Sequence, residues 1–186
     1  MKNDVRAIGD ISRRNVLSFT LPLAVGLIAS PALAGPARGV RSLSLRHRHT
    51  GESVTADYWI DGWYDPDALA EIDRVLRDFR ADQVRSIDRK LLDLLHRVGT
   101  ELGSDVEFEI FSAYRSPKTN AALAKRRSGV ARKSLHIQGQ AVDVTLPGRR
   151  LRDVRRAAKA LRAGGVGYYP RSGFVHLDVG PVRYWS

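Results

Sequence analysis

The chain has 186 residues, a formal net charge of +11 at pH 7 and no cysteine. This length suits one domain with a sizeable core, and the lack of cysteine excludes disulfides, a thiolate metal site and a lipoprotein anchor. The charge favours an anionic partner, which could be nucleic acid, anionic lipid or an anionic polymer.

Residues 1–34 carry the features of an export signal in the order that such signals have them. A twin-arginine pattern at residues 12–17 precedes an apolar run at 19–28 and a small-residue cleavage site at 32–34. The apolar run is too short for a comfortable membrane span. We therefore predict a twin-arginine signal peptide over residues 1–34, export to the periplasm, and a single domain over residues 35–186 without a stable membrane span after cleavage.

The expected export narrows the choice of partner. An exported protein meets little nucleic acid, so anionic cell-wall material is the partner that the positive charge favours. The alternative is that the scattered arginines only keep the surface solvated.

The domain is expected to begin with a β-hairpin. Residues 43–49 alternate apolar and polar side chains, and residues 54–60 are rich in β-branched and aromatic types, with a turn between them. His47 and His49 share one face of the first strand, where they could be metal ligands. Their cationic neighbours, and the lack of a carboxylate beside them in the sequence, favour a solvated face instead.

Two core helices are expected next. Asp65 suits an N-cap and Pro66 the first helical position, and apolar residues then recur at helical spacing over residues 69–79. A second apolar stripe runs over residues 84–102, with His96 predicted to be a surface or packing residue.

Arg115 stands at a predicted strand-to-helix turn. An alternating strand over residues 106–110 leads into this turn, and a third helix begins after Ser116 with Pro117 at its start. Such turns often place side chains in a cleft. The guanidinium would suit a substrate carboxylate or a developing oxyanion, and the alternative is a surface salt bridge. A fourth helix is expected over residues 151–161.

Two later segments supply the ligand types of a metal ion. His136 precedes a short, largely buried strand that carries Asp143, and a carboxylate there is costly unless it is paired or bound to a cation. The later strand carries His176 and Asp178 on one face. Two imidazoles and one carboxylate suit a catalytic zinc that keeps one position open for water.

Each of these residues alone has a simpler explanation. A single His in an apolar segment is usually a hydrogen-bonded core residue, and a single Asp often caps a turn. The three together favour a metal site, because the chain has only five histidines and two of them fall in these segments. The role of Asp178 stays open: it could orient a ligand histidine, act as a catalytic base, or belong to the turn before Gly180.

These motifs resemble the M15-type zinc peptidases, which include D-Ala-D-Ala carboxypeptidases and dipeptidases and share a fold with the Hedgehog signalling domain. The chain is most similar to the murein endopeptidase K-like (DUF882) subgroup. The resemblance covers nearly all of the predicted domain and rests on residues 50–52, 61–62, 77–78, 112–117, 134–143 and 165–178. It implies an α+β fold in which a small antiparallel sheet carries the zinc site and packs against several helices.

The resemblance also implies roles for individual residues. It implies one Zn²⁺ per chain, held by the three ligands His136, Asp143 and His176. Arg115 takes the place of the family's substrate- and oxyanion-binding arginine, and we expect Tyr114 and Tyr168 to bind substrate beside it. Many M15 enzymes have a catalytic Glu three residues before the last ligand, where this chain has Gly173. Asp178 is then our candidate for the base, because it shares a strand face with His176.

The function implied is a zinc-dependent peptidoglycan endopeptidase, which hydrolyses peptide cross-links between stem peptides by attack of a zinc-activated water. Cross-links between two diaminopimelate residues are the leading candidates for the bond. One alternative, motivated by the missing Glu, is a non-catalytic peptidoglycan-binding module with a structural zinc. Another is a D,D- or L,D-carboxypeptidase. We expect a monomer that binds peptidoglycan and no nucleic acid.

Overall fold

Strands and helices follow one another along most of the chain, and the computed structural model describes residues 38–103, 106–126 and 131–186. The signal peptide predicted for residues 1–34 lies outside these ranges and stays a prediction. In chain order the elements are β1 (Val40–His47), β2 (Ser53–Ile60), β3 (Trp63–Tyr64), α1 (Pro66–Val75), α2 (Arg89–Leu102), β4 (Glu107–Ser112), α3 (Pro117–Arg126), the 3₁₀ turn η1 (Leu135–Gln138), β5 (Ala141–Thr145), α4 (Leu151–Leu161), β6 (Gly165–Tyr169), β7 (Phe174–Asp178) and β8 (Arg183–Trp185).

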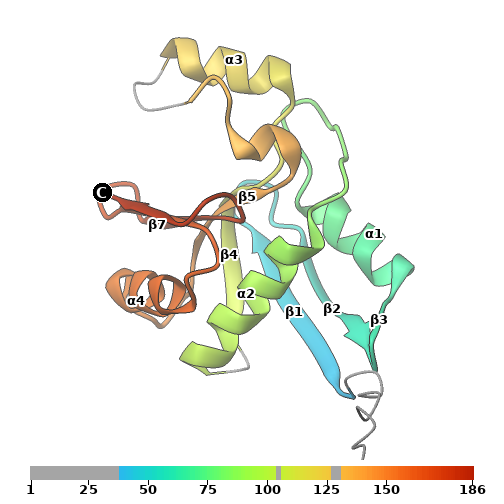
Figure 1. Cartoon of the computed structure of the whole chain (residues 1–186). Helices are drawn as coiled ribbons and strands as arrows, with labels where there is room; N and C mark the ends of the chain where they lie inside the picture. The colour runs from blue at the N-terminus through green and yellow to red at the C-terminus, as the bar shows by residue number, and fades with distance from the viewer. Residues whose placement is uncertain (1–37, 104–105, 127–130) are drawn as a thin grey trace, which may run out of the picture. The chain divides into compact units, whose positions relative to one another are not determined.

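The described residues contain eight strands, which form one mixed sheet in the order β3-β2-β1-β4-β5-β7-β6-β8 (Figure 1). The predicted α+β class is confirmed, but the sheet is larger than expected and not wholly antiparallel. β1 pairs with β4, and β6 with β8, in parallel. The first parallel pair arises because α1 and α2 carry the chain back before β4 begins. The second arises because β8 reverses direction after β7 and therefore runs with β6.

The helices α1, α2 and α4 cover one face of the sheet (Figure 1). α1 packs on β1 and β2, α2 on β1 and α4, and α4 on β6 and β7. The apolar residues of the central strands face these helices and form the core, among them Val142, Val144, Val175 and Leu177. Because side chains alternate along a strand, Asp143 and His176 lie on the opposite face. None of the helices in the described ranges has the length and apolar character needed to cross a bilayer.

The start of α2 differs from the sequence prediction. The apolar stripe predicted a helix from about Val84, but α2 begins at Arg89, because the Asp88 carboxylate accepts the backbone N–H of Lys90 and caps the helix there. A β-bridge between Asp78 and Gln83 closes the preceding chain into a tight loop. Val84 is consequently exposed instead of lying in the core.

His47 also differs from its prediction, because its side chain is 1% exposed and does not lie on a solvated face. β1 is an interior strand of the sheet, and alternation places His47 on the same inward face as Leu43 and Leu45. The ring packs edge-on against Phe79, with 4.9 Å between the ring centroids. Its Nδ1 accepts the backbone N–H groups of His49 and Thr50, at 3.2 and 3.3 Å.

His47 should therefore make the fold sensitive to mild acid. Burial, followed by the nearby His49, lowers the pKa of His47 to about 4, from 6.5 in the unfolded chain. Above pH 6.5, His47 is neutral in both the folded and the unfolded chain. Below pH 6.5, His47 is protonated in the unfolded chain first. The stabilisation is thus complete above pH 6.5 and is lost as the pH falls toward 4, by roughly 3 kcal/mol in all.

Replacing His47 with Gln removes this titration. Urea unfolding of the His47→Gln variant should show a smaller fall in the free energy of unfolding between pH 7 and 4.5 than wild type shows. His96→Gln, at a partly exposed position of α2, is the matched control and should retain the wild-type slope. An equal pH dependence for wild type and His47→Gln would contradict the assignment.

Candidate metal centre and active site

Strand register brings two of the predicted metal ligands together. β5 and β7 pair antiparallel, with Asp143 directly opposite His176. Residues opposite each other in such a pair point to the same face, with neighbouring Cβ atoms about 4.5–5.5 Å apart. Two side chains separated by 33 positions in the sequence therefore lie next to each other, and their atoms His176 Nδ1 and Asp143 Oδ1 are 2.8 Å apart.

His136 reaches this pair from the 3₁₀ turn η1. The hydroxyl of Ser134 caps the turn by accepting the N–H of His136, and Gly139 ends it in a left-handed conformation with φ of 69°. A Cβ at Gly139 would lie 2.7 Å from the backbone oxygen of Ser86, so no other residue fits there without a shift. The backbone N–H of Arg115 donates to the carbonyl of His136 and ties the turn to the end of β4. The imidazole is thus held at 1% exposure.

The three ligand atoms have the spacing of a metal site. His136 Nε2 lies 3.3 Å from His176 Nδ1 and 3.4 Å from Asp143 Oδ1. With bonds of about 2.0–2.1 Å, neighbouring ligand atoms of a tetrahedral zinc lie roughly 3.3 Å apart. Within the described ranges, these three residues form the one group of His, Cys, Asp or Glu that could hold a metal ion. The two distances to His136 Nε2 and the donor types fit Zn²⁺, whereas the 2.8 Å between His176 Nδ1 and Asp143 Oδ1 is a hydrogen-bond distance.

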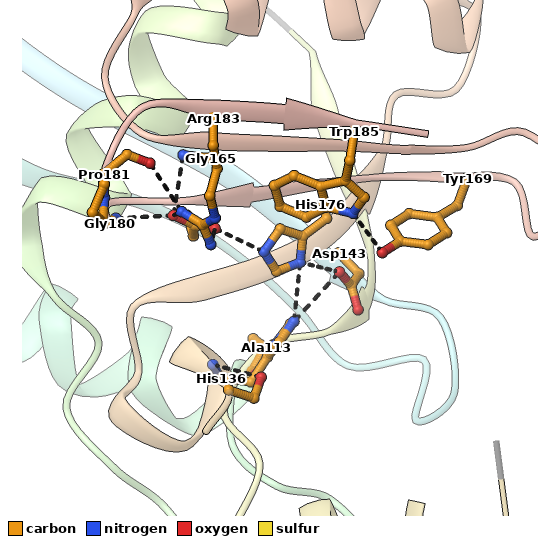
Figure 2. A network of polar contacts seen from close by, with 12 residues as sticks. Ala113, His136, Asp143, Gly165, Tyr169, His176, Gly180, Pro181, Arg183 and Trp185 are labelled. Carbon is orange, nitrogen blue, oxygen red and sulfur yellow. Dashed lines mark hydrogen bonds and ion pairs between the residues drawn. The ribbon is translucent and has the colours of Figure 1, made fainter. Parts of the chain in front are cut away.

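The remaining ring nitrogens fix which atoms face the metal. Nδ1 of His136 donates to the carbonyl of Ala113 at 2.7 Å, which leaves the Nε2 lone pair for the ion. Nε2 of His176 donates to Asp178 Oδ2 at 3.0 Å, which leaves its Nδ1 lone pair (Figure 2). Each imidazole is therefore oriented by a fixed acceptor, the arrangement that protein metal sites use to position histidine ligands.

The electrostatics of the group favour a cation. Burial lowers the pKa of His176, but hydrogen bonds to Asp143 and Asp178 outweigh it and raise the value to about 9. Burial would raise the pKa of Asp143, yet the charges and hydrogen bonds of the two histidines hold it well below its usual range. For His136, burial dominates and lowers the pKa. Two carboxylates thus stabilise positive charge at the point on which the ligand atoms converge.

Asp178 lies behind His176, on the side away from the cavity. It is fully buried, and both carboxylate oxygens are occupied: Oδ2 accepts from His176 and Arg183, and Oδ1 from Arg183 and from the backbone N–H groups of Gly165 and Gly180 (Figure 2). A catalytic base must reach a substrate proton or a water. The geometry therefore favours the role of orienting His176 over the role of base.

The Asp178→Asn variant separates these two roles. If Asp178 orients His176, zinc affinity measured by competition with a chelator should fall about 10- to 100-fold, because the hydrogen bond that fixes the ring loses its charge. Turnover at saturating zinc should fall much less. Unchanged zinc affinity combined with a large loss of turnover would instead restore the base role.

Two glycines of β6 make room for this arrangement. A Cβ at Gly165 would lie 2.4 Å from Asp178 Oδ2, and a Cβ at Gly167 would lie 2.6 Å from the indole of Trp185. Gly167 is opposite both His176 and Trp185 in the sheet, so the indole lies over it, with its centroid 5.3 Å from that of His176. The glycines at alternate positions of β6 are the feature of the sequence that could have indicated this close packing against Asp178 and Trp185.

A cavity of about 480 Å³ opens at the metal group. Its wall contains the three ligands together with Arg115, Ala131, Lys133, Ser134, Leu135, Tyr169, Ser172, Phe174, Arg183 and Trp185. The only carboxylate among these is Asp143. The cavity is therefore cationic and aromatic around the ligand group, which suits a substrate that carries negative charge.

Arg115 lies in this wall, as the sequence predicted. Its Nη2 donates to the hydroxyl of Ser134 at 3.2 Å, whereas its Nε is buried without a partner in the described part of the chain. Burial lowers the pKa of the guanidinium, which has no salt bridge to a described residue. The negative charges of Asp143 and Asp78 act against this effect, so the guanidinium is a half-buried cation beside the ligand group with an Nε that stays available to a ligand of the cavity.

The two tyrosines predicted to bind substrate lie elsewhere. Tyr114 is 7% exposed and belongs to the core, and Tyr168 lies beneath Arg155 of α4, on the helical face of the sheet. The next residue, Tyr169, lines the cavity instead, and its hydroxyl accepts the indole N–H of Trp185 at 2.8 Å (Figure 2). Tyr169 is at an alternate position from Gly165 and Gly167 in β6, so it lies on the same face of the sheet as these glycines, which is the face of the site.

Gly173 occupies a position in which a catalytic Glu would be strained. It lies in the turn between β6 and β7 with φ of 81°, and its N–H donates to the carbonyl of Tyr169. This left-handed conformation is costly for residues with a Cβ. A Glu at this position would therefore strain the hairpin between β6 and β7.

Comparison with known proteins gives a continuous match. Residues 35–185 match the family described as peptidoglycan L,D-endopeptidase MepK. The chain is 42% identical over 178 residues to the peptidoglycan L,D-endopeptidase MepK of Escherichia coli (strain K12), which covers 95% of this chain and 98% of the relative. The protein of the same name from Shigella flexneri gives the same values. The probable peptidoglycan L,D-endopeptidase MepK of Haemophilus influenzae is 40% identical over 147 residues, which is 78% of this chain and 79% of the relative. Because the family match runs through both ligand-bearing segments, the chain belongs to the peptidoglycan L,D-endopeptidase MepK family, as its resemblance to the M15 peptidases predicted.

Proposed function

We propose that this protein is a zinc-dependent peptidoglycan endopeptidase that hydrolyses the L,D cross-links between stem peptides. The observation that carries the proposal is the convergence of His136 Nε2, Asp143 Oδ1 and His176 Nδ1 in the wall of an open cavity. Membership of the MepK family supports the class of bond, because its named relatives are L,D-endopeptidases.

The residues of the site have separate roles in binding the metal, orienting a ligand and binding the substrate. His136, Asp143 and His176 would hold the zinc, and Asp178 would keep His176 in its ligand orientation. When bound, zinc lowers the pKa of a water molecule and polarises a carbonyl. Arg115 would hold the carbonyl oxygen as it gains negative charge, since its guanidinium lies in the cavity wall and its Nε has no partner among the described residues.

Tyr169 supplies a further polar group at the cavity. Its oxygen accepts a hydrogen bond from Trp185, so its own O–H is left to donate. We assign it a substrate-binding role in place of Tyr168, since it lies in the cavity wall.

The sequence of residues 1–34 supports export by the twin-arginine pathway. This pathway carries proteins already folded, so the zinc could be acquired before export. Peptidoglycan as substrate requires a periplasmic location, and the positive charge of the chain suits a carboxylate-rich wall. We propose that the protein acts there as a monomer.

Defined muropeptide dimers test the choice of bond. The zinc-loaded protein should cleave an L,D-cross-linked dimer into two monomers while leaving a D,D-cross-linked dimer of the same composition intact. Shortening of a monomeric stem by one residue would instead identify a carboxypeptidase. Failure to cleave the L,D-cross-linked dimer, the D,D-cross-linked dimer and the monomeric stem would refute the proposal.

A further inference from the structure

The hydroxyl of Tyr169 has a hydrogen-bonding direction that the fold determines. Its oxygen accepts the indole N–H of Trp185 at 2.8 Å, and no acceptor for its own O–H lies within the described residues. A phenol can accept one hydrogen bond and donate another at the same time. Because Tyr169 lines the cavity at the metal group, the donor side of the hydroxyl is available to a molecule bound there.

The indole that sets this direction is itself held in place. Trp185 is opposite Gly167 in the parallel pair of β6 and β8, and a Cβ at Gly167 would lie 2.7 Å from the indole Nε1. The indole can therefore lie directly on the backbone of β6, beside Tyr169. Its ring centroid is 5.3 Å from that of His176 and 5.1 Å from the guanidinium carbon of Arg183. Packing on these sides fixes the N–H that the Tyr169 oxygen accepts.

The Tyr169 hydroxyl lies near the other groups that would act on the substrate. Figure 2 shows its hydroxyl end pointing toward Trp185 and Asp143. Burial lowers the pKa of Arg115, and Tyr169 is close enough to be among the smaller influences on that pKa. The phenol O–H of Tyr169 and the Nε of Arg115 are thus two donors, from β6 and from the end of β4, in the wall of one cavity.

The other polar side chains of the wall are less suited to hold a reacting oxygen. Lys133 and Ser172 are exposed, so their polar atoms are not fixed by packing. The hydroxyl of Ser134 already accepts from Arg115 and from the backbone N–H of His136. A donor stabilises a developing oxyanion best when it is oriented before the reaction, because it then needs no reorganisation. Tyr169 meets this condition through its hydrogen bond with the indole.

We infer that the Tyr169 hydroxyl donates a hydrogen bond to the oxygen of the scissile carbonyl as that oxygen gains negative charge, and that Trp185 is the positioning residue that directs this hydroxyl. The inference rests on the proposed function and deepens it, because Tyr169 then acts in the transition state and not only in substrate binding. Tyr169 and Arg115 share the developing charge, and neither transfers a proton.

Kinetics of the zinc-loaded full chain on an L,D-cross-linked dimer test both roles. Tyr169→Phe removes only the hydroxyl and should lower kcat about 10²-fold with little change in KM, as for the loss of one oxyanion donor. Trp185→Phe removes the N–H but keeps a ring, and should lower kcat roughly 3- to 10-fold, the net contribution of one hydrogen bond. It should have little further effect when Tyr169→Phe is also present. Tyr168→Phe, on the helical face of the sheet, is the matched control and should behave as wild type.

Binding of a phosphinate analogue of the cross-link gives a readout that does not depend on turnover. Its tetrahedral, anionic group resembles the transition state, so Tyr169→Phe should bind it about 10²-fold more weakly in calorimetry than wild type does. The zinc content of Tyr169→Phe, measured by mass spectrometry, should equal that of wild type, because Tyr169 is not a metal ligand.

Three results would overturn the inference. A Tyr169→Phe variant that keeps the wild-type kcat, or that loses zinc, overturns the role of Tyr169 at the reacting oxygen. Equal losses of kcat for Trp185→Phe with and without Tyr169→Phe overturn the positioning role of Trp185. If wild type does not cleave the dimer, the proposed function itself fails and the inference fails with it, and this result is distinct from the other two because they require an active wild type.

Discussion

The His136→Ala variant is expected to lower kcat/KM on an L,D-cross-linked dimer by about 10³-fold or more. The substitution removes one of three metal ligands, and a catalytic metal contributes several kcal/mol of transition-state stabilisation, of which each 1.36 kcal/mol is tenfold in rate. Product formation measured by chromatography and zinc content measured by mass spectrometry should fall together. The circular dichroism spectrum should persist, because the capping hydroxyl of Ser134 and the left-handed Gly139 hold the turn without the imidazole.

His96→Ala is the control for this variant. His96 lies on α2, outside the cavity, where its Nδ1 contacts the carbonyl of Ser42. It should retain both zinc and activity. Full turnover by a metal-stripped His136→Ala sample would contradict the assignment of the metal centre.

Arg115→Gln is expected to lower kcat by about 10²- to 10³-fold, the usual loss when one donor to a developing oxyanion is removed. The free energy of unfolding should change little, because Arg115 forms no salt bridge within the described residues and its Nε has no partner there. Stopped assays for kcat and urea unfolding for stability measure the two effects separately.

Arg77→Gln is the matched control, with the opposite pattern. Arg77 is a buried arginine that donates to Glu52 at 2.7 Å and to Asp82 at 2.6 Å. The substitution removes both of these charge-assisted hydrogen bonds from a side chain that is 9% exposed, which is destabilising although the two carboxylates are partly exposed. Arg77→Gln should therefore lose stability and retain most of its turnover when folded. If Arg115→Gln behaved in the same way, Arg115 would be a structural residue.

Much of the metal centre could be predicted from the sequence, because its ligands occur in short segments with clear local patterns. The period of two in β7 places His176 and Asp178 on one face, and the apolar context of β5 makes Asp143 unusual. Their contact depends on strand register. The alternating pattern predicts each strand but not which residue lies opposite which, so the pairing of Asp143 with His176 comes from the structure.

The remaining differences have physical causes. His47 was predicted to be solvated because cationic residues flank it. Its strand is interior to the sheet, however, and the side chain of His47 points to the same buried face as that of Leu45. Tyr168 was predicted to bind substrate, whereas Tyr169 lines the cavity, because the sequence prediction did not assign the faces of β6. The surroundings of Asp178 include Arg183 and two backbone N–H groups, and no local pattern in the sequence indicates all of these contacts.

Digestion of purified sacculi tests the central claim most directly. The protein is incubated with sacculi alone, with a chelator, and with chelator followed by excess zinc, and the products are separated by chromatography and weighed by mass spectrometry. We predict new peptide ends with the masses of opened L,D cross-links, which vanish with chelator and return with zinc. Binding to sacculi without new peptide ends under any of these conditions would contradict the claim and identify a wall-binding module instead.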